Sequence, residues 1–111
     1  MKITEWIEHY RKANYFPVGE GWRSLVEKLV NDIAKIDPKV EVTQVKEKFG
    51  TLRFYISGGN DEVDNLIEKA ERKSSTICEI CGKKGKPRDL PWVLTLCADC
   101  YRRRYEKDPK I

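Results

Sequence analysis

Apolar residues recur at helical spacing in three stretches of this chain. Neighbouring apolar positions in each stretch lie mostly three or four residues apart, so they fall on one side of a helix. The sequence therefore predicts three amphipathic helices, of which the middle one has the longest apolar stripe. The positions are Ile3, Trp6, Ile7 and Tyr10 in the first stretch, Trp22, Leu25, Val26, Leu29, Val30 and Ile33 in the second, and Val63, Leu66, Ile67 and Ala70 in the third.

Between the second and third stretches the pattern changes to that of a β-hairpin. Residues 39–48 are rich in β-branched side chains, and apolar residues occupy alternate positions from Leu52 to Ile56, as in a strand with one buried face. Phe49 and Gly50 mark the turn between the two strands. The apolar positions of the first strand change parity near Thr43 and Gln44, which predicts a β-bulge there.

Cap and turn residues separate these elements. Asp37-Pro38 ends the second helix, and Asn60 is a favourable N-cap for the third, whose first turn is acidic and whose last turn is basic. We therefore expect an α+β fold. Residues 1–75 form a core in which the helices pack on an antiparallel β-hairpin, and residues 76–111 form a cysteine module that packs on this core.

The four cysteines form two matched pairs, Cys78-Glu-Ile-Cys81 and Cys97-Ala-Asp-Cys100, with 15 residues between them. Each Cys-x₂-Cys pair can place two thiolates on one metal ion, and two pairs complete a tetrahedral shell. The pattern predicts one structural Zn²⁺ held by all four sulfurs. Such a shell has no open position for water or substrate, so the metal stabilises the fold and performs no chemistry.

Three other uses of the cysteines fit the sequence less well. Two disulfides require an oxidising compartment, whereas the N-terminus carries two acids and no apolar run, unlike a signal peptide, and we expect a cytoplasmic protein. A dithiol redox site needs only one pair, beside a βαβ pattern that this sequence lacks. Iron also suits four thiolates, but a rubredoxin-like site has a glycine after both pairs. Here only Cys81 is followed by glycine.

The residues around the cysteines predict how the module folds. Gly82 permits a left-handed backbone after the first pair, and residues 83–96 contain turn residues followed by a strand-like run at 92–96. The second pair falls in the first turn of a final helix, whose dipole favours thiolates. A knuckle, a hairpin and a ligand-bearing helix in this order resemble a treble-clef zinc finger over residues 76–107.

Three motifs follow one another along the chain. They are Gly21-Trp22 at the start of a helix, the hairpin run Lys46-Glu-Lys-Phe-Gly-Thr-Leu-Arg-Phe-Tyr55, and Trp92-x₂-Thr-Leu-Cys97 between the cysteine pairs. Together they resemble small phage and prophage proteins of uncharacterised function, over most of residues 21–100. The resemblance implies a mobile genetic element as the setting, and it brings no activity with it.

Composition narrows the functional class. The 111 residues are 40% hydrophobic and 36% charged, which is enough for one modest core, and no apolar run is long enough for a membrane span. His9 is the single histidine and has no metal-ligand spacing, and zinc binding leaves no cysteine for a nucleophile. We therefore expect a non-enzymatic protein without a small-molecule substrate.

Charge points to nucleic acid as one kind of partner. The formal charge is +4, and the chain from Cys78 onward carries nine Lys or Arg against five Asp or Glu, which accounts for the excess. Basic side chains interleaved with an aromatic ring can contact the phosphates and bases of DNA or RNA. The candidate residues are Lys83, Lys84, Lys86, Arg88, Arg102, Arg103 and Lys107 in the module, and Arg53 and Tyr55 in the hairpin.

Aromatic residues point to a protein partner instead. Three Trp and five Tyr are many for a core of this size, and both residue types frequently anchor protein interfaces. Tyr15, Phe16 and Trp92 are the candidate protein-binding residues. Because a phage setting favours this interpretation, the leading expectation is a zinc-stabilised protein that binds a host protein. DNA or RNA binding is the alternative.

Overall fold

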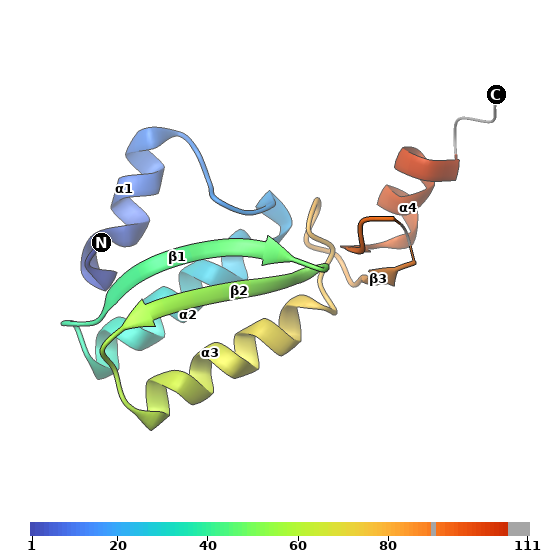
Figure 1. Cartoon of the computed structure of the whole chain (residues 1–111). Helices are drawn as coiled ribbons and strands as arrows, with labels where there is room; N and C mark the ends of the chain where they lie inside the picture. The colour runs from blue at the N-terminus through green and yellow to red at the C-terminus, as the bar shows by residue number, and fades with distance from the viewer. Residues whose placement is uncertain (90, 107–111) are drawn as a thin grey trace.

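A computed structural model describes residues 1–89 and 91–106, without the side chains of residues 105 and 106. It shows the predicted α+β fold, in which helices pack on an antiparallel hairpin and a cluster of four cysteines follows (Figure 1). In chain order the elements are η1 (Ile3–Glu5), α1 (Trp6–Ala13), η2 (Glu20–Trp22), α2 (Arg23–Ile36), β1 (Glu41–Lys48), β2 (Thr51–Ser57), α3 (Asp61–Ser74), β3 (Lys86–Arg88), β4 (Leu94–Leu96), α4 (Ala98–Tyr101) and the π-helical turn η3 (Arg102–Glu106).

The central hairpin consists of β1 and β2 in an antiparallel pair. Its register shifts between Val42 and Gln44, which confirms the predicted β-bulge. Phe49 and Gly50 form the connecting turn, with φ angles of +54° and +80°. Positive φ at both central residues is the conformation that matches a two-residue turn to the twist of its strands, so the turn is also where the sequence predicts it.

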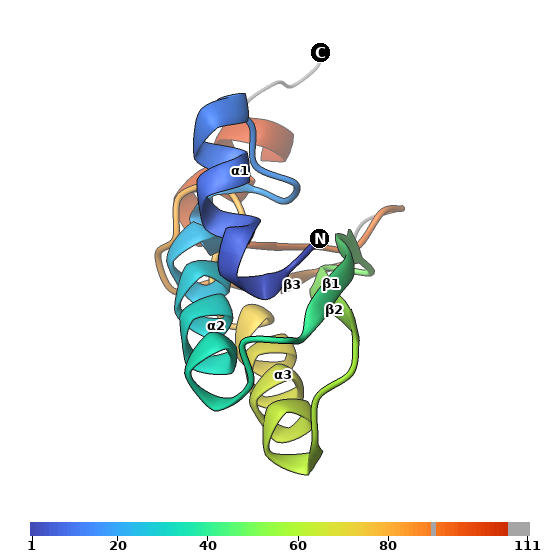
Figure 2. The ribbon, with the colours of Figure 1, turned by 90° about the vertical axis from the view of Figure 1, so that its left-hand side faces the viewer.

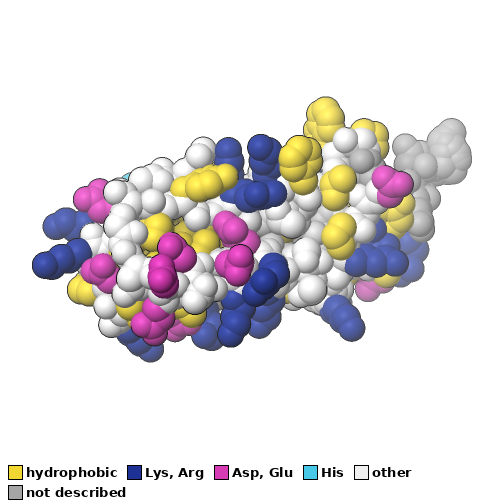
Figure 3. Space-filling view, turned by 60° about the horizontal axis from the view of Figure 1, so that its bottom comes forward, with side chains coloured by type: hydrophobic (Ala, Val, Ile, Leu, Met, Phe, Trp, Pro, Cys, Tyr) yellow, Lys and Arg dark blue, Asp and Glu magenta, His cyan; other side chains and the backbone are white. Residues whose placement is uncertain are grey.

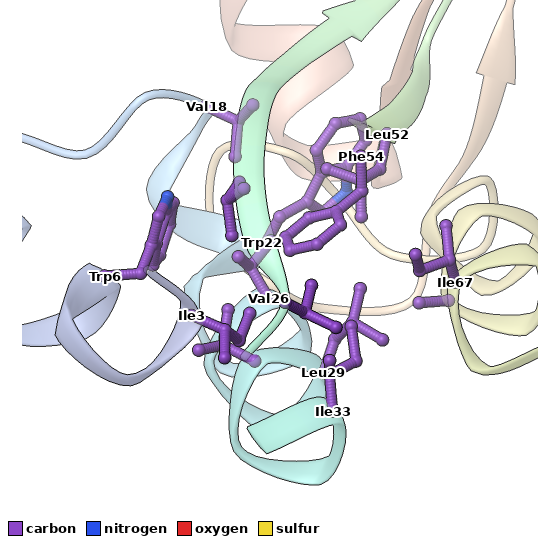
Figure 4. Close-up of a cluster of buried hydrophobic side chains, with 14 of the residues drawn as sticks. Ile3, Trp6, Val18, Trp22, Val26, Leu29, Ile33, Leu52, Phe54 and Ile67 are labelled. Carbon is purple, nitrogen blue, oxygen red and sulfur yellow. The ribbon is translucent and has the colours of Figure 1, made fainter. Parts of the chain in front are cut away.

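The hydrophobic core lies between the hairpin and two helices. α2 and α3 run side by side across one face of the hairpin, and α1 packs beside α2 (Figures 1 and 2). Side chains of α2 lie between those of the hairpin, of α3 and of the N-terminal segment (Figure 4). The predicted helical stripes supply most of this core, whose buried residues are Ile3, Trp6, Phe16, Val18, Trp22, Val26, Leu29, Val30, Ile33, Val40, Val42, Leu52, Phe54, Val63, Ile67 and Ala70.

Side chains of α3 and the first residues of the chain cover parts of both hairpin edges. On β2, the Leu52 N–H donates to the Ser74 hydroxyl at 2.9 Å, and the Phe54 N–H donates to a Glu71 carboxylate oxygen at 2.8 Å. Beside β1, the N-terminal residues add a short bridge to the start of the strand. These contacts satisfy backbone donors that an edge strand otherwise leaves unpaired.

Cap chemistry agrees with the sequence, whereas the C-terminal elements are shorter than expected. The Val63 N–H donates to the Asn60 side-chain oxygen at 3.0 Å, so Asn60 caps α3 as predicted. The strand-like run at 92–96 forms a strand only over its last three residues, in β4. α4 has four residues and continues as η3, and Lys107, which the expected final helix includes, lies outside the described residues.

The cysteine module extends the molecule beyond one end of the hairpin. β3, β4 and α4 lie past the turn at Phe49 and Gly50, and the molecule measures 52 × 29 × 20 Å along its principal axes (Figure 1). Contacts at this end of the hairpin therefore determine how the module is held. In the part of the chain that the structure describes, no helix has both the length and the apolar character to cross a membrane.

Candidate metal centre

The four cysteine sulfurs form one compact cluster. All four Sγ atoms lie within 4.8 Å of one another, and Cys81 Sγ is 3.6 Å from Cys97 Sγ. Sulfurs that bind a tetrahedral Zn²⁺ at about 2.3 Å are separated from one another by about 3.8 Å. All four residues are free cysteines. The two predicted pairs thus come together in a cluster of the size that one four-sulfur metal site requires.

The first pair lies in a knuckle that backbone hydrogen bonds close. The Cys78 N–H donates to the Lys83 carbonyl at 2.7 Å, and the Gly82 N–H donates to the Cys78 carbonyl at 2.9 Å. Gly82 has a φ angle of +85°, the left-handed conformation expected for a glycine in this position. The knuckle thereby brings the sulfurs of Cys78 and Cys81 to the same cluster.

The second pair begins the last helix. Cys97 is the N-cap of α4, and the Cys100 N–H donates to Cys97 Sγ at 3.4 Å. A sulfur in this position accepts from N–H groups that have no partner inside the helix. β3 and β4 pair antiparallel between the two cysteine pairs. Knuckle, hairpin and helix therefore follow in the order that the sequence predicts.

Burial and hydrogen bonding act on the thiols in opposite directions. Burial raises the pKa of Cys78, but hydrogen bonds from nearby backbone N–H groups, that of Cys97 foremost, outweigh it and lower the pKa to about 6. The Cys100 N–H also lowers the pKa of Cys97. Burial and, after it, the neighbouring thiols together raise the pKa of Cys100 to about 12. Because four adjacent thiolates repel one another, a divalent cation is needed for all four to be charged.

The surroundings of the sulfurs contain one cation and one buried carboxyl group. Arg103 Nη2 donates to Cys100 Sγ at 3.7 Å, a contact that favours the thiolate form. Glu79 lies between the cysteines of the first pair, and burial, followed by the nearby carboxylate of Glu47, raises its pKa to about 7. The buried Glu79 Oε1 atom has no hydrogen-bond partner among the described residues.

The short helix η2, immediately before α2, fastens the core to the knuckle. The Gly21 N–H donates to the Glu79 carbonyl at 2.8 Å, and the Trp22 indole N–H donates to the Ile77 carbonyl at 2.8 Å. A Cβ atom at Gly21 would overlap the Cys78 carbonyl group. Only glycine therefore allows the two backbones to approach so closely.

The hairpin turn makes the second attachment to the module. The buried Thr95 hydroxyl in β4 donates to the Gly50 carbonyl at 2.7 Å. A Cβ added at Gly50 would lie 3.2 Å from Val93 Cγ1, so the turn and the start of β4 are in close contact. Phe49 precedes Gly50 and Trp92 precedes Val93, and these two aromatic side chains are 68% and 78% exposed. Both therefore emerge at the junction between core and module.

Three of the basic residues predicted to bind nucleic acid are engaged within the module. Arg88 is half-buried, donates from Nε to the Leu96 carbonyl at 3.2 Å, and places its guanidinium 4.7 Å from the centre of the Tyr101 ring. Arg102 forms an ion pair with Asp99. Arg103 is exposed but donates to Cys100 Sγ. Of the other candidates in the module, Lys83, Lys84 and Lys86 are exposed, and Lys107 lies outside the described residues.

The three predicted protein-binding aromatics differ in exposure. Trp92 and Tyr15 are exposed, Tyr15 by 61%. Phe16 is only 8% exposed; its ring packs edge-on against Trp6 at 5.7 Å, and the Arg23 guanidinium lies 4.4 Å above it. Phe16 therefore belongs to the hydrophobic core and, unlike Trp92 and Tyr15, does not present its ring at the surface.

Sequence reasoning missed two residues at the junction. In the hairpin, Tyr55 is exposed and Arg53 is half-buried, but the most exposed aromatic of this element is Phe49, which the pattern identifies only as a turn residue. The sequence did contain a sign of this exposure, because a bulky phenylalanine at the tip of a two-residue turn projects beyond both strands. Gly21 carried no comparable signal, because its role depends on a knuckle that lies far along the sequence.

Comparisons with protein-family models, with curated proteins and with solved structures give no match to this chain. The four-cysteine centre and the surfaces next to it are therefore the features from which a function is inferred.

Proposed function

We propose that this chain is a non-enzymatic binding protein stabilised by one Zn²⁺. The observation that carries the metal assignment is the set of four free cysteine sulfurs within 4.8 Å of one another. A bound zinc supplies folding free energy and leaves no open coordination position. Zinc is favoured over iron because only the first pair is followed by glycine, whereas the second pair begins a helix.

Two observations support a binding role over a catalytic one. His9, the single histidine, is exposed on α1 with its ring against Tyr10. Among residues 1–89 and 91–106, the cysteines are the one group of three or more His, Cys, Asp or Glu side chains that lie close enough to share a metal. A closed four-sulfur shell offers no position at which a substrate is activated.

The charges of the hairpin favour nucleic acid as the partner. Lys46 lies opposite Arg53 in the strand register, and Lys46 Nζ lies 5.7 Å from the centre of the exposed Tyr55 ring. Cations beside aromatic rings suit phosphates and bases together. A host protein is the second candidate, favoured by the exposure of Trp92 and Tyr15. The resemblance to phage proteins supplies the setting in either case.

Metal analysis and nucleic-acid titration of the purified full chain test this proposal. We expect one zinc per chain, and binding to a mixed pool of DNA and RNA that weakens steeply with salt, because phosphate contacts release counterions. Iron, no metal or two disulfides would overturn the metal assignment. Zinc-loaded protein that binds no nucleic acid at low salt would overturn the nucleic-acid partner and leave the host protein as the better account.

A further inference from the structure

One face of the hairpin carries basic side chains and no carboxylates along its central part. Opposite residues of an antiparallel pair share a face, and the alternate residues Leu52 and Phe54 are buried in the core. The opposite face, called here the outer face, therefore points away from the core. Its residues along this stretch are Gln44, Lys46 and Lys48 on β1, and Thr51, Arg53 and Tyr55 on β2.

Glu47, the one acidic residue in this stretch of the two strands, lies on the face opposite to the outer face. Glu47 alternates with Lys46 and Lys48 along β1, and its carboxylate accepts a hydrogen bond from the Gly50 N–H at 2.8 Å. This contact keeps the carboxylate at the backbone of the turn. The charge of the outer face is therefore positive along this stretch, and it complements a ligand that carries regularly spaced negative charges.

No helix in the described part of the chain covers the outer face. In Figure 2 the hairpin lies to the right of α2 and α3, and no helix lies on its far side. Figure 3 turns this face toward the top, where dark-blue Lys and Arg side chains lie among yellow hydrophobic ones along the upper edge. The outer face is thus accessible and extends toward the module.

Exposed aromatic rings lie beside these cations. Tyr55 is 42% exposed, with Lys46 Nζ 5.7 Å from the centre of its ring. Phe49 is 68% exposed, with Lys48 Nζ 5.5 Å from the centre of its ring. Each ring therefore has an ammonium group over one face and keeps surface in solvent on which a planar group can stack.

Phe49 adopts a backbone conformation that its side chain disfavours. Its φ angle of +54° is left-handed, a region that glycine and asparagine enter at lower cost than a bulky residue. The ring gains little burial in return, since it is 68% exposed. A strained residue whose side chain is not used for packing indicates a contact with a partner.

The module adds a third ring to this surface. The Thr95 hydroxyl and the Val93 side chain hold β4 against Gly50, so Trp92, the most exposed large hydrophobic residue described, emerges at the same junction as Phe49. Because these two rings belong to the module and to the hairpin, their relative placement depends on the metal that holds the module.

We propose that the outer face and this junction bind single-stranded nucleic acid, DNA or RNA, an inference that rests on the nucleic-acid function proposed above. Bases stack on the three exposed rings, and backbone phosphates contact the three cations between and beside them. The residues of the site are Tyr55, Lys46, Arg53, Lys48, Phe49 and Trp92.

A single strand fits this surface better than a duplex or a protein does. A duplex offers phosphates but keeps its bases stacked inside and presents only their edges in the grooves, so the rings would lack a planar ligand. A protein partner would have to provide carboxylates for three cations, because a cation buried at an interface without a partner is costly. An unpaired strand supplies base faces and phosphates in alternation.

Fluorescence anisotropy of the zinc-loaded full chain with labelled oligo(dT) and oligo(U) tests this site. Oligonucleotides of about 12 nucleotides are within the range of site sizes of single-strand binders. Phe49→Asn is the central variant, because asparagine suits the left-handed turn and removes the ring. We expect Phe49→Asn, Trp92→Ser and Tyr55→Thr each to weaken binding roughly 5- to 100-fold. Lys46→Gln should reduce the slope of log affinity against log salt by about 0.7.

Tyr15→Ser and Lys35→Gln are matched controls, since both residues are exposed and lie outside the outer face. Both should leave affinity unchanged, and every variant should keep its zinc. Binding that survives Phe49→Asn and Trp92→Ser would overturn this site while leaving the nucleic-acid function in place. A duplex bound as tightly as the single strand would overturn the single-strand assignment. Absence of binding to any oligonucleotide at low salt would overturn both proposals.

Discussion

The α+β core and the cysteine module are stabilised by different means. The core contains a cluster of sixteen buried hydrophobic residues drawn from the N-terminal segment, α2, α3 and the hairpin. The buried cluster of the module has four members, of which three are cysteines and one is Leu96. Burial of apolar surface stabilises by about 25 cal/mol per Å², so it can hold the core, whereas the module buries too little. We therefore expect the module to depend on a metal ion bound by its four cysteines.

This difference also explains how the two regions are joined. The junction uses hydrogen bonds from Gly21, Trp22 and Thr95 to carbonyl groups on the other side. Such contacts need both backbones in fixed positions, which the module provides only when it is folded. We consequently expect metal binding to affect the surface as well as the fold, because a folded module places Trp92 at the junction beside Phe49.

Removing one cysteine ligand should have the largest effect, and it should destabilise the module but not the core. We expect Cys100→Ser to abolish stoichiometric zinc binding and to unfold the module, because structural zinc contributes on the order of 10 kcal/mol in finger peptides. The core should stay folded. Elemental analysis and amide hydrogen exchange measure the two effects. Retention of one zinc per chain, or unfolding of the core together with the module, would contradict the account.

Gly21→Ala should disturb the attachment between the two regions without removing a ligand. The added Cβ would overlap the Cys78 carbonyl group, and such overpacking costs about 3 kcal/mol. Urea unfolding of the zinc-loaded protein measures this loss. Ser24→Ala, an exposed change in the next turn, is the matched control and should stay within about 0.5 kcal/mol of the parent. Equal stability of both variants would show that the close contact is not needed.

Thr95→Val should weaken the second attachment by a smaller amount. Valine fills nearly the same space but leaves the Gly50 carbonyl without the donor that now lies 2.7 Å away, a loss of about 1 to 2 kcal/mol. Zinc content should be unchanged, and the NMR signals of Phe49 and Gly50 should shift. An unaltered spectrum at the turn would mean that this hydrogen bond does not position the hairpin against the module.

Ser74→Ala should have the smallest effect, and it should act on the core alone. The change leaves the Leu52 N–H without its acceptor, which costs about 1 kcal/mol. Ser75→Ala is the matched control, because the Ser75 hydroxyl donates to a helix carbonyl in the same way but accepts no strand N–H. The difference between the variants should persist after zinc removal. Disappearance of this difference without metal would show that the core also depends on zinc.

Features set by neighbouring residues could be predicted from the sequence. The helical stripes, the bulge before Gln44, the turn at Phe49 and the Asn60 cap each follow from a few adjacent side chains. The four candidate ligands could be predicted equally well, because four thiols at this spacing have few other uses and the spacing itself brings the two cysteines of each pair together.

Features that depend on distant segments could not be predicted. Phe16 lies in a loop with proline and glycine. In such a loop the sequence pattern does not distinguish an aromatic ring that is buried from one that is exposed. The need for glycine at position 21 appears only when the knuckle lies against it. The surface formed by Phe49 and Trp92 likewise arises from two turns that tertiary contacts bring together.

Amide NMR spectra of the full chain before and after chelation test the central claim most directly. We expect chelation to collapse the signals of residues 76–104 and to shift those of Gly21, Phe49 and Gly50, while signals from the middle of α2 and α3 stay dispersed. Added zinc should restore the original spectrum. A module that stays dispersed without metal, or a core that loses its dispersion together with the module, would contradict the division into a hydrophobic core and a metal-dependent module.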